Sequence, residues 1–481
     1  EKYGLKVNLY DEYPYPSGIA GGEVIMNNPE YKAQRLIQKS EIIHGGQIKL
    51  KLPYGKVLSV KAYPINEGKI NWEDEINLKS NVGMVLTEDS YNETGLTTYN
   101  QKRYFASNPR PVLEVELPQG KYKVFISVQA DVESFKYWDN YVDVLNKKAI
   151  NDFIQLTHER YAKKYKNKFG DSIISIFTDE VYPGWSEKII SKFKKEYNYD
   201  LREKLPALKD KDHDHPDHTR VFYDLYRLKY KMFVNAFEKP VNSWCHNNDI
   251  NYSGEKDVLR FDQFKYMDIP GCDPGHIKAG NEMDILKSSL RKNARAVASA
   301  SYFYDNPGSL CECYHSIGWS ASLQDAKLIG EGLILLGIDY LVPHGFFYST
   351  HGLKKHDAPP SYFFQMPFWP LFDRLSERFN EIYKHFEDTY IDSDILVIDP
   401  HSGIPENEDL EVYERLQSVL MGNHIDFQIA DTDILKKGNI KNGNLYINDL
   451  SIKMIIIPPM KIIEKPLQTW LNQFEEKGGN V

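Results

Sequence analysis

The chain has 481 residues, of which 41% are hydrophobic, 26% are charged and 13% are aromatic, and its formal net charge is −9. These proportions are typical of a globular protein long enough for a large core and several domains. The negative charge without a basic stripe excludes nucleic acid as the main partner, and no apolar run of about 18 residues predicts a membrane-spanning helix.

Both ends of the sequence look cut from a longer protein. Residues 6–10 read as a strand almost at once, and residues 478–481 stop where another strand begins. No signal peptide is recognised, so we expect a cytoplasmic location and no membrane partner.

The first third of the chain predicts an interrupted domain. Residues 5–12 read as a strand and residues 29–40 as a helix. Short alternating runs such as 47–52 and 112–117, separated by Pro and Gly turns, then predict an inserted β-rich domain over residues 44–130.

Helix and strand patterns alternate over residues 131–390, which favours an α/β class with parallel strands. Strands end at Glu180, Glu255, near Met267, at Glu312 and at His344. Counting residues 6–10 as the second strand and 123–128 as the third gives a (β/α)8 TIM-type barrel. Residues 1–43 form its first part, and its first strand lies upstream of residue 1.

Residues 391–481 predict a separate doubly wound α/β domain, truncated at its end, with strands at 394–398, 426–429 and 453–459. It has no glycine-rich phosphate loop, so we expect no nucleotide. It is the surface through which we would expect any oligomer to form.

Two acids at strand ends, Glu180 and Glu312, are the expected catalytic residues. Carboxyl ends of barrel strands carry the chemistry of this fold, and two carboxylates can flank one bond as a general acid and its partner. The alternative for each is a helix cap or a hydrogen bond to substrate.

Other strand-end residues are expected to bind substrate. Acids and His344 can bind sugar hydroxyls, and aromatic rings can stack on sugars, although a structural histidine and core-packed tryptophans are equally good explanations. The expected residues are Asp11, Glu12, Asp179, Trp185, Glu255, Trp319, His344 and Tyr348.

A histidine cluster, His213, His215 and His218, could hold a transition metal. The favoured interpretation is a solvated, mixed-charge loop, so no residue is assigned as a metal ligand.

Several motifs together resemble glycoside hydrolase family 106, the α-L-rhamnosidases and their bacterial relatives, over about residues 5–370. They are YDEYPYPSG at residues 10–18, THERY at 157–161, FTDE at 177–180, ECY at 312–314 and PHGFFYS at 343–349. The resemblance implies an inverting pair of carboxylates and a calcium ion near the site.

The tail resembles the amidotransferase-like domain that follows the barrel in family 42 β-galactosidases. Resemblance to those retaining barrels implies that Glu180 is the acid/base and Glu312 the nucleophile.

The sequence therefore predicts a glycoside hydrolase acting on an oligosaccharide or glycoside that contains rhamnose or galactose. A non-catalytic glycan-binding protein is the alternative, and a metal-dependent hydrolase is the third. We expect the proton on Glu180, since Phe177 and Trp185 could raise the pKa of its carboxyl, and the negative charge on Glu312.

Overall fold

The computed structural model divides into two compact units, which are described separately. The first comprises Glu1–Val24, Ile150–Tyr182 and Val234–Val481, and the second comprises Ile25–Ala149 and Pro183–Phe233. The described residues are 3–13, 15–86, 91–94, 102–105, 109–136, 138–209, 214–274, 285–356, 358–387, 389–404 and 407–481.

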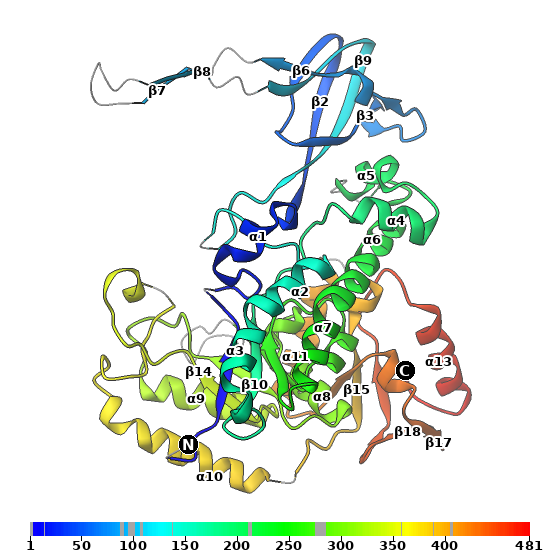
Figure 1. Ribbon diagram of the computed structural model, residues 1–481. Coiled ribbons are helices and arrows are strands. Elements are labelled where there is room, and N and C mark those ends of the chain that lie inside the picture. Colours follow the sequence, from blue (N-terminus) through cyan, green and yellow to red (C-terminus); the bar gives the residue numbers. More distant parts are fainter. Residues whose placement is uncertain are drawn as a thin grey trace. The chain divides into compact units, whose positions relative to one another are not determined.

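The first unit is built on a six-stranded parallel sheet (Figure 1), which confirms the α/β class. Its strands pair in chain order, so each successive strand adds beside the previous one. They are β1 (Val7–Tyr10), β10 (Ile173–Asp179), β11 (Asn251–Glu255), β12 (Ile269–Cys272), β13 (Leu310–Cys313) and β14 (Tyr340–Pro343).

A complete eight-stranded barrel is not found among the described residues. β1 pairs directly with β10, so no strand lies between them, and the expected third strand at residues 123–128 belongs to β9 (Pro109–Asp131) of the second unit. Residues 123–128 carry the β-branched and apolar residues of a buried strand, and the same composition suits an antiparallel sheet that is covered on one face.

Helices connect the parallel strands, as right-handed crossovers require. α9 begins with a capping box, in which Ser322 and Asp325 each accept the other's backbone N–H, and it packs against α10. These helices are α2 (Lys147–Leu156, continuous between the units), α3 (His158–Tyr165), the π-helix η5 (Val234–Glu238), α7 (Lys239–His246), α8 (Ala294–Tyr304), α9 (Leu323–Leu335) and α10 (Phe372–Phe386).

The C-terminal part of the first unit has its own small parallel sheet, in the order β16-β15-β20. It joins the larger sheet through α8, where the buried Ser299 hydroxyl accepts from Ile429 N at 3.0 Å and Arg295 Nε donates to Phe427 O at 2.5 Å. Its elements are β15 (Ile395–Ile398), α11 (Asn407–Gly422), β16 (Gln428–Ala430), α12 (Thr432–Leu435), β17 (Asn439–Lys441), β18 (Asn444–Ile447), β19 (Leu450–Ile452), β20 (Met454–Ile456) and α13 (Lys465–Glu476).

The second unit is an antiparallel sheet in the order β2-β9-β3-β4, with three helices. The expected helix over residues 29–40 is wrong: residues 34–40 are in β2, where they pair with residues 125–131 of β9. This strand also continues past the expected domain boundary at residue 44. The elements are α1 (Glu23–Asn27, between the units), β2 (Gln34–Lys51), β3 (Lys56–Asn66), β4 (Lys69–Ile70), β5 (Ile76–Asn77), β6 (Val82–Leu86), β7 (Tyr91–Thr94), β8 (Lys102–Phe105), α4 (Ile189–Tyr197), α5 (Leu201–Lys209) and α6 (His218–Phe233).

Short 3-10 turns complete the described structure. They lie at Ala20–Gly22, Pro29–Tyr31, Lys79–Asn81, Lys166–Lys168, Phe261–Tyr266, Leu290–Lys292, Gly352–Lys355, Trp369–Leu371 and Pro400–Gly403. Among the residues that the structure describes, no helix combines the length and the apolar character needed to cross a bilayer.

Candidate active site

An apolar layer on one face of the parallel sheet shows which strand-end residues point to that face. Phe177, Ile269 and Leu310 form a buried cluster, against which Tyr10 and Val342 pack. Because strand side chains alternate between two faces, the residue two positions further along points to the same face, nearer the carboxyl ends of the strands. Four of these five strands place a polar residue there, namely Glu12, Asp179, Glu312 and His344.

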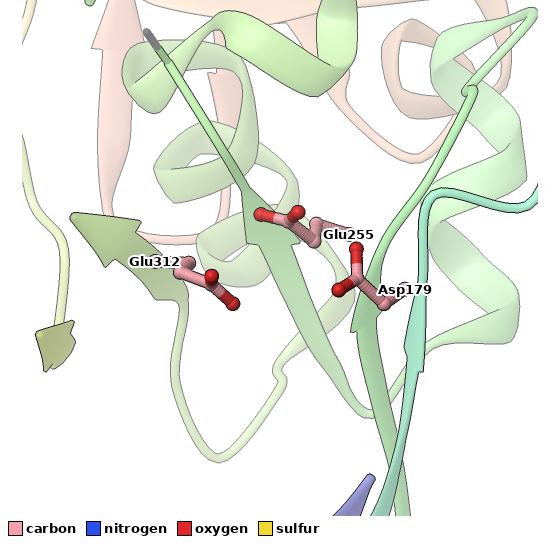
Figure 2. Close-up of side chains that lie close together, drawn as sticks. All are labelled: Asp179, Glu255 and Glu312. Atoms are coloured by element: carbon pink, nitrogen blue, oxygen red, sulfur yellow. The ribbon is translucent and has the colours of Figure 1, made fainter. Parts of the chain in front are cut away.

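Three carboxylates from three strands converge at this edge. Asp179, Glu255 and Glu312 each bring one oxygen to within 4.8 Å of the others, and Figure 2 shows the side chains turned toward one another. Their residues are only 7%, 2% and 9% exposed. Three buried like charges repel strongly, so this cluster must hold protons or a bound cation.

The acids respond by holding protons. Burial, followed by the charges of Asp179 and Asp273, raises the pKa of Glu312 to about 8. Burial likewise raises the pKa of Asp179 and of Glu255 well above their usual range, and the side chains of Asp179 and Glu12 lie within hydrogen-bond reach of each other. Tyr10 OH donates to Glu312 Oε2 at 3.0 Å and fixes that carboxyl.

Glu180 joins the cluster by breaking the strand alternation. Directly after Asp179 its side chain should point to the opposite face, but its backbone has a φ of 40°, which is left-handed and costly for a residue other than glycine. Its N–H still donates to Glu255 O at 2.9 Å. The side chain receives hydrogen bonds from Tyr15 OH and Arg291 Nη2.

A second group of acids surrounds that arginine. One oxygen each from Glu180, Glu255 and Asp273 lies within 4.8 Å of the others, and Arg291 Nη2 also donates to Asp273 Oδ2 at 2.9 Å. Burial alone would raise the pKa of Asp273, but the contact with His315 and the charge of Arg291 lower it to about 2. Asp273 is therefore ionised and paired with cations, whereas Glu255 keeps its raised pKa.

The surroundings of the two glutamates differ from those expected. Glu180 contacts a guanidinium, which favours an ionised carboxylate, whereas burial among acids raises the pKa of Glu312 and favours its protonated form. Trp185, expected to give Glu180 apolar surroundings, belongs to the second unit. There it is 7% exposed and its Nε1 donates to Gln129 Oε1 at 3.3 Å.

The other expected substrate-binding residues divide into three kinds. Asp11 is fully buried and is turned to His158 Nε2, at 2.8 Å, and to the Ser17 hydroxyl, so it stabilises the loop after β1. Glu12 belongs to the acid cluster. Trp319, which is 36% exposed, and Tyr348, which is 89% exposed, lie on loops after β13 and β14.

His344 connects the acids to one of those loops. Its ring makes edge contacts with His315 and Phe347, at centroid distances of 6.2 and 6.0 Å, and Phe347 in turn contacts Trp319 at 6.2 Å. A row of rings therefore runs from His315, which contacts Asp273, to Trp319.

The histidine cluster does not converge on one point in the described residues. His215 Nδ1 accepts from Asp217 N at 3.0 Å, and the ring packs on Trp72. His218 Nδ1 lies 2.7 Å from Ala207 O. Both are 9% exposed, so they are buried rather than solvated as expected, and His213 lies outside the described residues.

The sequence interpretation missed three residues of the site, namely Tyr15, Asp273 and Arg291. Asp273 follows β12 directly, so the strand-end signal that identified Glu255 applied to it too. Arg291 lies in the short turn Leu290–Lys292, which has no recognisable pattern, and only the fold brings it to the acids.

The cation that the family resemblance implies would find suitable ligands here. Asp179 Oδ1 and Glu255 Oε2 are buried and receive no hydrogen bond from an N–H or O–H group of the described residues. Calcium prefers carboxylate oxygens, so Asp179, Glu255 and Glu312 fit it.

Residues 139–358 match a family of glycoside hydrolases, family 106, described as alpha-L-rhamnosidase. This part of the chain is similar to that family. A rhamnosidase from Novosphingobium sp. PP1Y has a similar structure, with a TM-score of 0.54 and 13% identity over 84% of this chain. The chain covers 38% of that enzyme's length, and at this identity the likeness shows a shared fold.

Weaker structural matches accompany it. A family 42 β-galactosidase from G. stearothermophilus covers 69% of this chain and 54% of its own length, with a TM-score of 0.48 and 11% identity. No curated protein matches this chain.

Proposed function

We propose that the chain carries the active site of a glycoside hydrolase that acts on neutral glycosides with a terminal sugar of the rhamnose type. The observation that carries the proposal is the pairing of two glutamates in opposite surroundings at the carboxyl ends of parallel strands. Glu312 is held protonated by burial among acids, and Glu180 is held ionised by Arg291. Glu255 lies within 4.8 Å of both.

Glu312 acts as the general acid. At neutral pH its carboxyl keeps the proton that the glycosidic oxygen needs as the bond breaks, and Tyr10 orients it. Glu180 acts as the ionised partner, which activates a water or attacks the anomeric carbon. The proposal keeps the pair of glutamates expected from the sequence but places the proton on Glu312 instead of Glu180.

Asp179 and Glu255 would hold a calcium ion, which would supply positive charge for binding sugar hydroxyls, and Glu312 would keep its proton as the acid.

The proposal is tested by a screen of nitrophenyl glycosides, with α-L-rhamnoside first, using the full chain and its Glu180→Gln and Glu312→Gln variants. We expect turnover by the parent protein and a loss of about 10²–10⁴-fold in each variant. Sugar binding by calorimetry without turnover in the parent would indicate the alternative, a non-catalytic glycan-binding protein.

A further inference from the structure

A cavity with a volume of about 1540 Å³ lies at the opposite edge of the parallel sheet from the acid cluster. Residues 304–308, which lead into β13, and residues 337–340, at the start of β14, form one side of it. The end of α10 and residues 421–428 of the C-terminal part form the other side. All of these belong to the first unit, and junctions between domains are frequent places for ligand sites.

Several aromatic side chains line this cavity. Tyr340, Phe386 and Tyr390 are 46%, 45% and 45% exposed, so part of each ring is accessible. The rings of Tyr302 and Tyr390 stack at 5.7 Å with an angle of 28° between their planes. Tyr304 and Tyr383 also line the cavity. Flat, partly exposed rings offer the surface on which the C–H faces of sugars pack.

Acidic side chains outnumber basic ones in the described lining of the cavity. Glu387 and five aspartates line it, together with His424 and three basic side chains, Lys384, Lys437 and the fully buried Arg295; the aspartates are Asp305, Asp339, Asp392, Asp426 and Asp449. Carboxylates accept hydrogen bonds from sugar hydroxyls, and an excess of negative charge disfavours an acidic ligand.

We propose that this cavity is a second carbohydrate site, which binds a neutral oligosaccharide without cleaving it. Rings for stacking and acceptors for hydroxyls occur together there, as recognition of an uncharged sugar chain requires. The site lies at the edge of the sheet opposite the acid cluster, so it goes beyond the proposed function and does not depend on any activity there.

The test is isothermal titration of the full chain with cellohexaose, xylohexaose and mannohexaose, with hexagalacturonic acid as the acidic counterpart. We expect at least one neutral hexasaccharide to bind and the acidic one not to bind. Tyr390→Ala should weaken that binding about tenfold or more. Tyr446→Ala is the matched control, since Tyr446 is 41% exposed on β18 and does not line the cavity.

Tyr340→Ala is a second cavity variant should Tyr390→Ala fail to fold, because Tyr340 lies on a different element. Glu312→Gln should bind the hexasaccharide as the parent does, which separates this site from the acid cluster. The proposal is overturned if no neutral hexasaccharide binds, if the cavity variants bind as tightly as Tyr446→Ala, or if Glu312→Gln alone abolishes binding. If the parent protein binds a neutral hexasaccharide but turns over no glycoside, only the proposed function is contradicted.

Discussion

Glu180 and Glu312 are the same residue type in opposite electrostatic surroundings, and the roles proposed for them rest on this difference. Glu180 has a guanidinium and a phenol as donors, whereas Glu312 has one phenol and several acids around it. A cation favours the ionised form of a carboxylate, and burial beside like charges favours the protonated form. Two glutamates can therefore serve as base and acid at one pH.

Arg291→Met tests the source of the negative charge on Glu180. Without the guanidinium, Glu180 and Asp273 gain protons more readily, so the acidic limb of the profile of kcat/KM against pH should move to higher pH. We also expect a loss of about 10²-fold at the optimum. Arg378→Met is the control, since Arg378 is 49% exposed and pairs with Glu331 on α9. An acidic limb that stays where it was would contradict the assigned role of Arg291.

At the scale of elements, β11 depends on a glycine to place Glu255. Gly254 has a φ of +153°, and a Cβ there would lie 2.3 Å from Thr178 O on β10. Gly254→Ala should therefore lower the free energy of unfolding by about 2 kcal/mol and displace the acid beside it. Gly83→Ala on β6 is the matched control, because nothing lies within 4 Å of its Cβ position. Equal denaturation midpoints for the two variants would refute this account of β11.

The π-helix η5 contributes a buried ion pair beneath the same strand. Lys256 Nζ lies 3.4 Å from Glu238 Oε2, and both side chains are fully buried. Lys256→Met should lower the free energy of unfolding by about 3–5 kcal/mol, because it leaves a buried charge without its partner. The double variant Lys256→Met/Glu238→Gln should recover most of that loss in denaturant titrations. A double variant as unstable as the single one would show that the lysine acts through packing instead.

The sequence predicted most parallel strands because each is a short apolar run followed by a polar residue. It failed at residues 123–128, where pairing along the length of β2 places an apolar strand in the other unit. The prediction also failed at residues 29–40, where the pattern suggested a helix but residues 34–40 pair with β9 as part of β2. Long-range strand pairing leaves no local signal, so neither error could be detected from the segment itself.

The sequence predicted those residues of the site that lie at the ends of strands. Asp179, Glu255 and Glu312 follow from position alone, since carboxyl ends of parallel strands meet at one edge. Arg291 does not, because its position depends on the turn Leu290–Lys292 packing beside β12. The raised pKa of Glu312 was unpredictable for a similar reason, since it results from burial and from acids on other elements.

At the scale of the whole molecule, buried protonated acids make stability depend on pH. Burial raises the pKa of Asp431 to about 7, well above the ordinary value of about 3.9 for an aspartate. A raised pKa means that the folded state binds the proton of Asp431 more tightly than the unfolded state does. The resulting contribution to the free energy of unfolding is complete below about pH 4 and is lost as the pH rises through 7.

Asp431→Asn should remove that dependence while keeping the cap of α12, since an amide oxygen can still accept from the N–H groups of Asp433 and Ile434. The melting temperature of the parent should fall between pH 5 and pH 8, and that of the variant should fall less. Parallel curves for the two proteins would contradict the protonated state of Asp431.

The central claim, that Glu312 donates the proton and Glu180 does not, is tested most directly by leaving-group dependence. Glu312→Gln and Glu180→Gln are assayed on two glycosides of the same sugar, one with an activated nitrophenyl group and one with a poor alkyl leaving group. An activated group needs little protonation, so Glu312→Gln should lose much more activity on the alkyl glycoside than on the nitrophenyl glycoside. Glu180→Gln should lose the same factor on both. The reverse pattern, or identical behaviour of the two variants, would contradict the assignment.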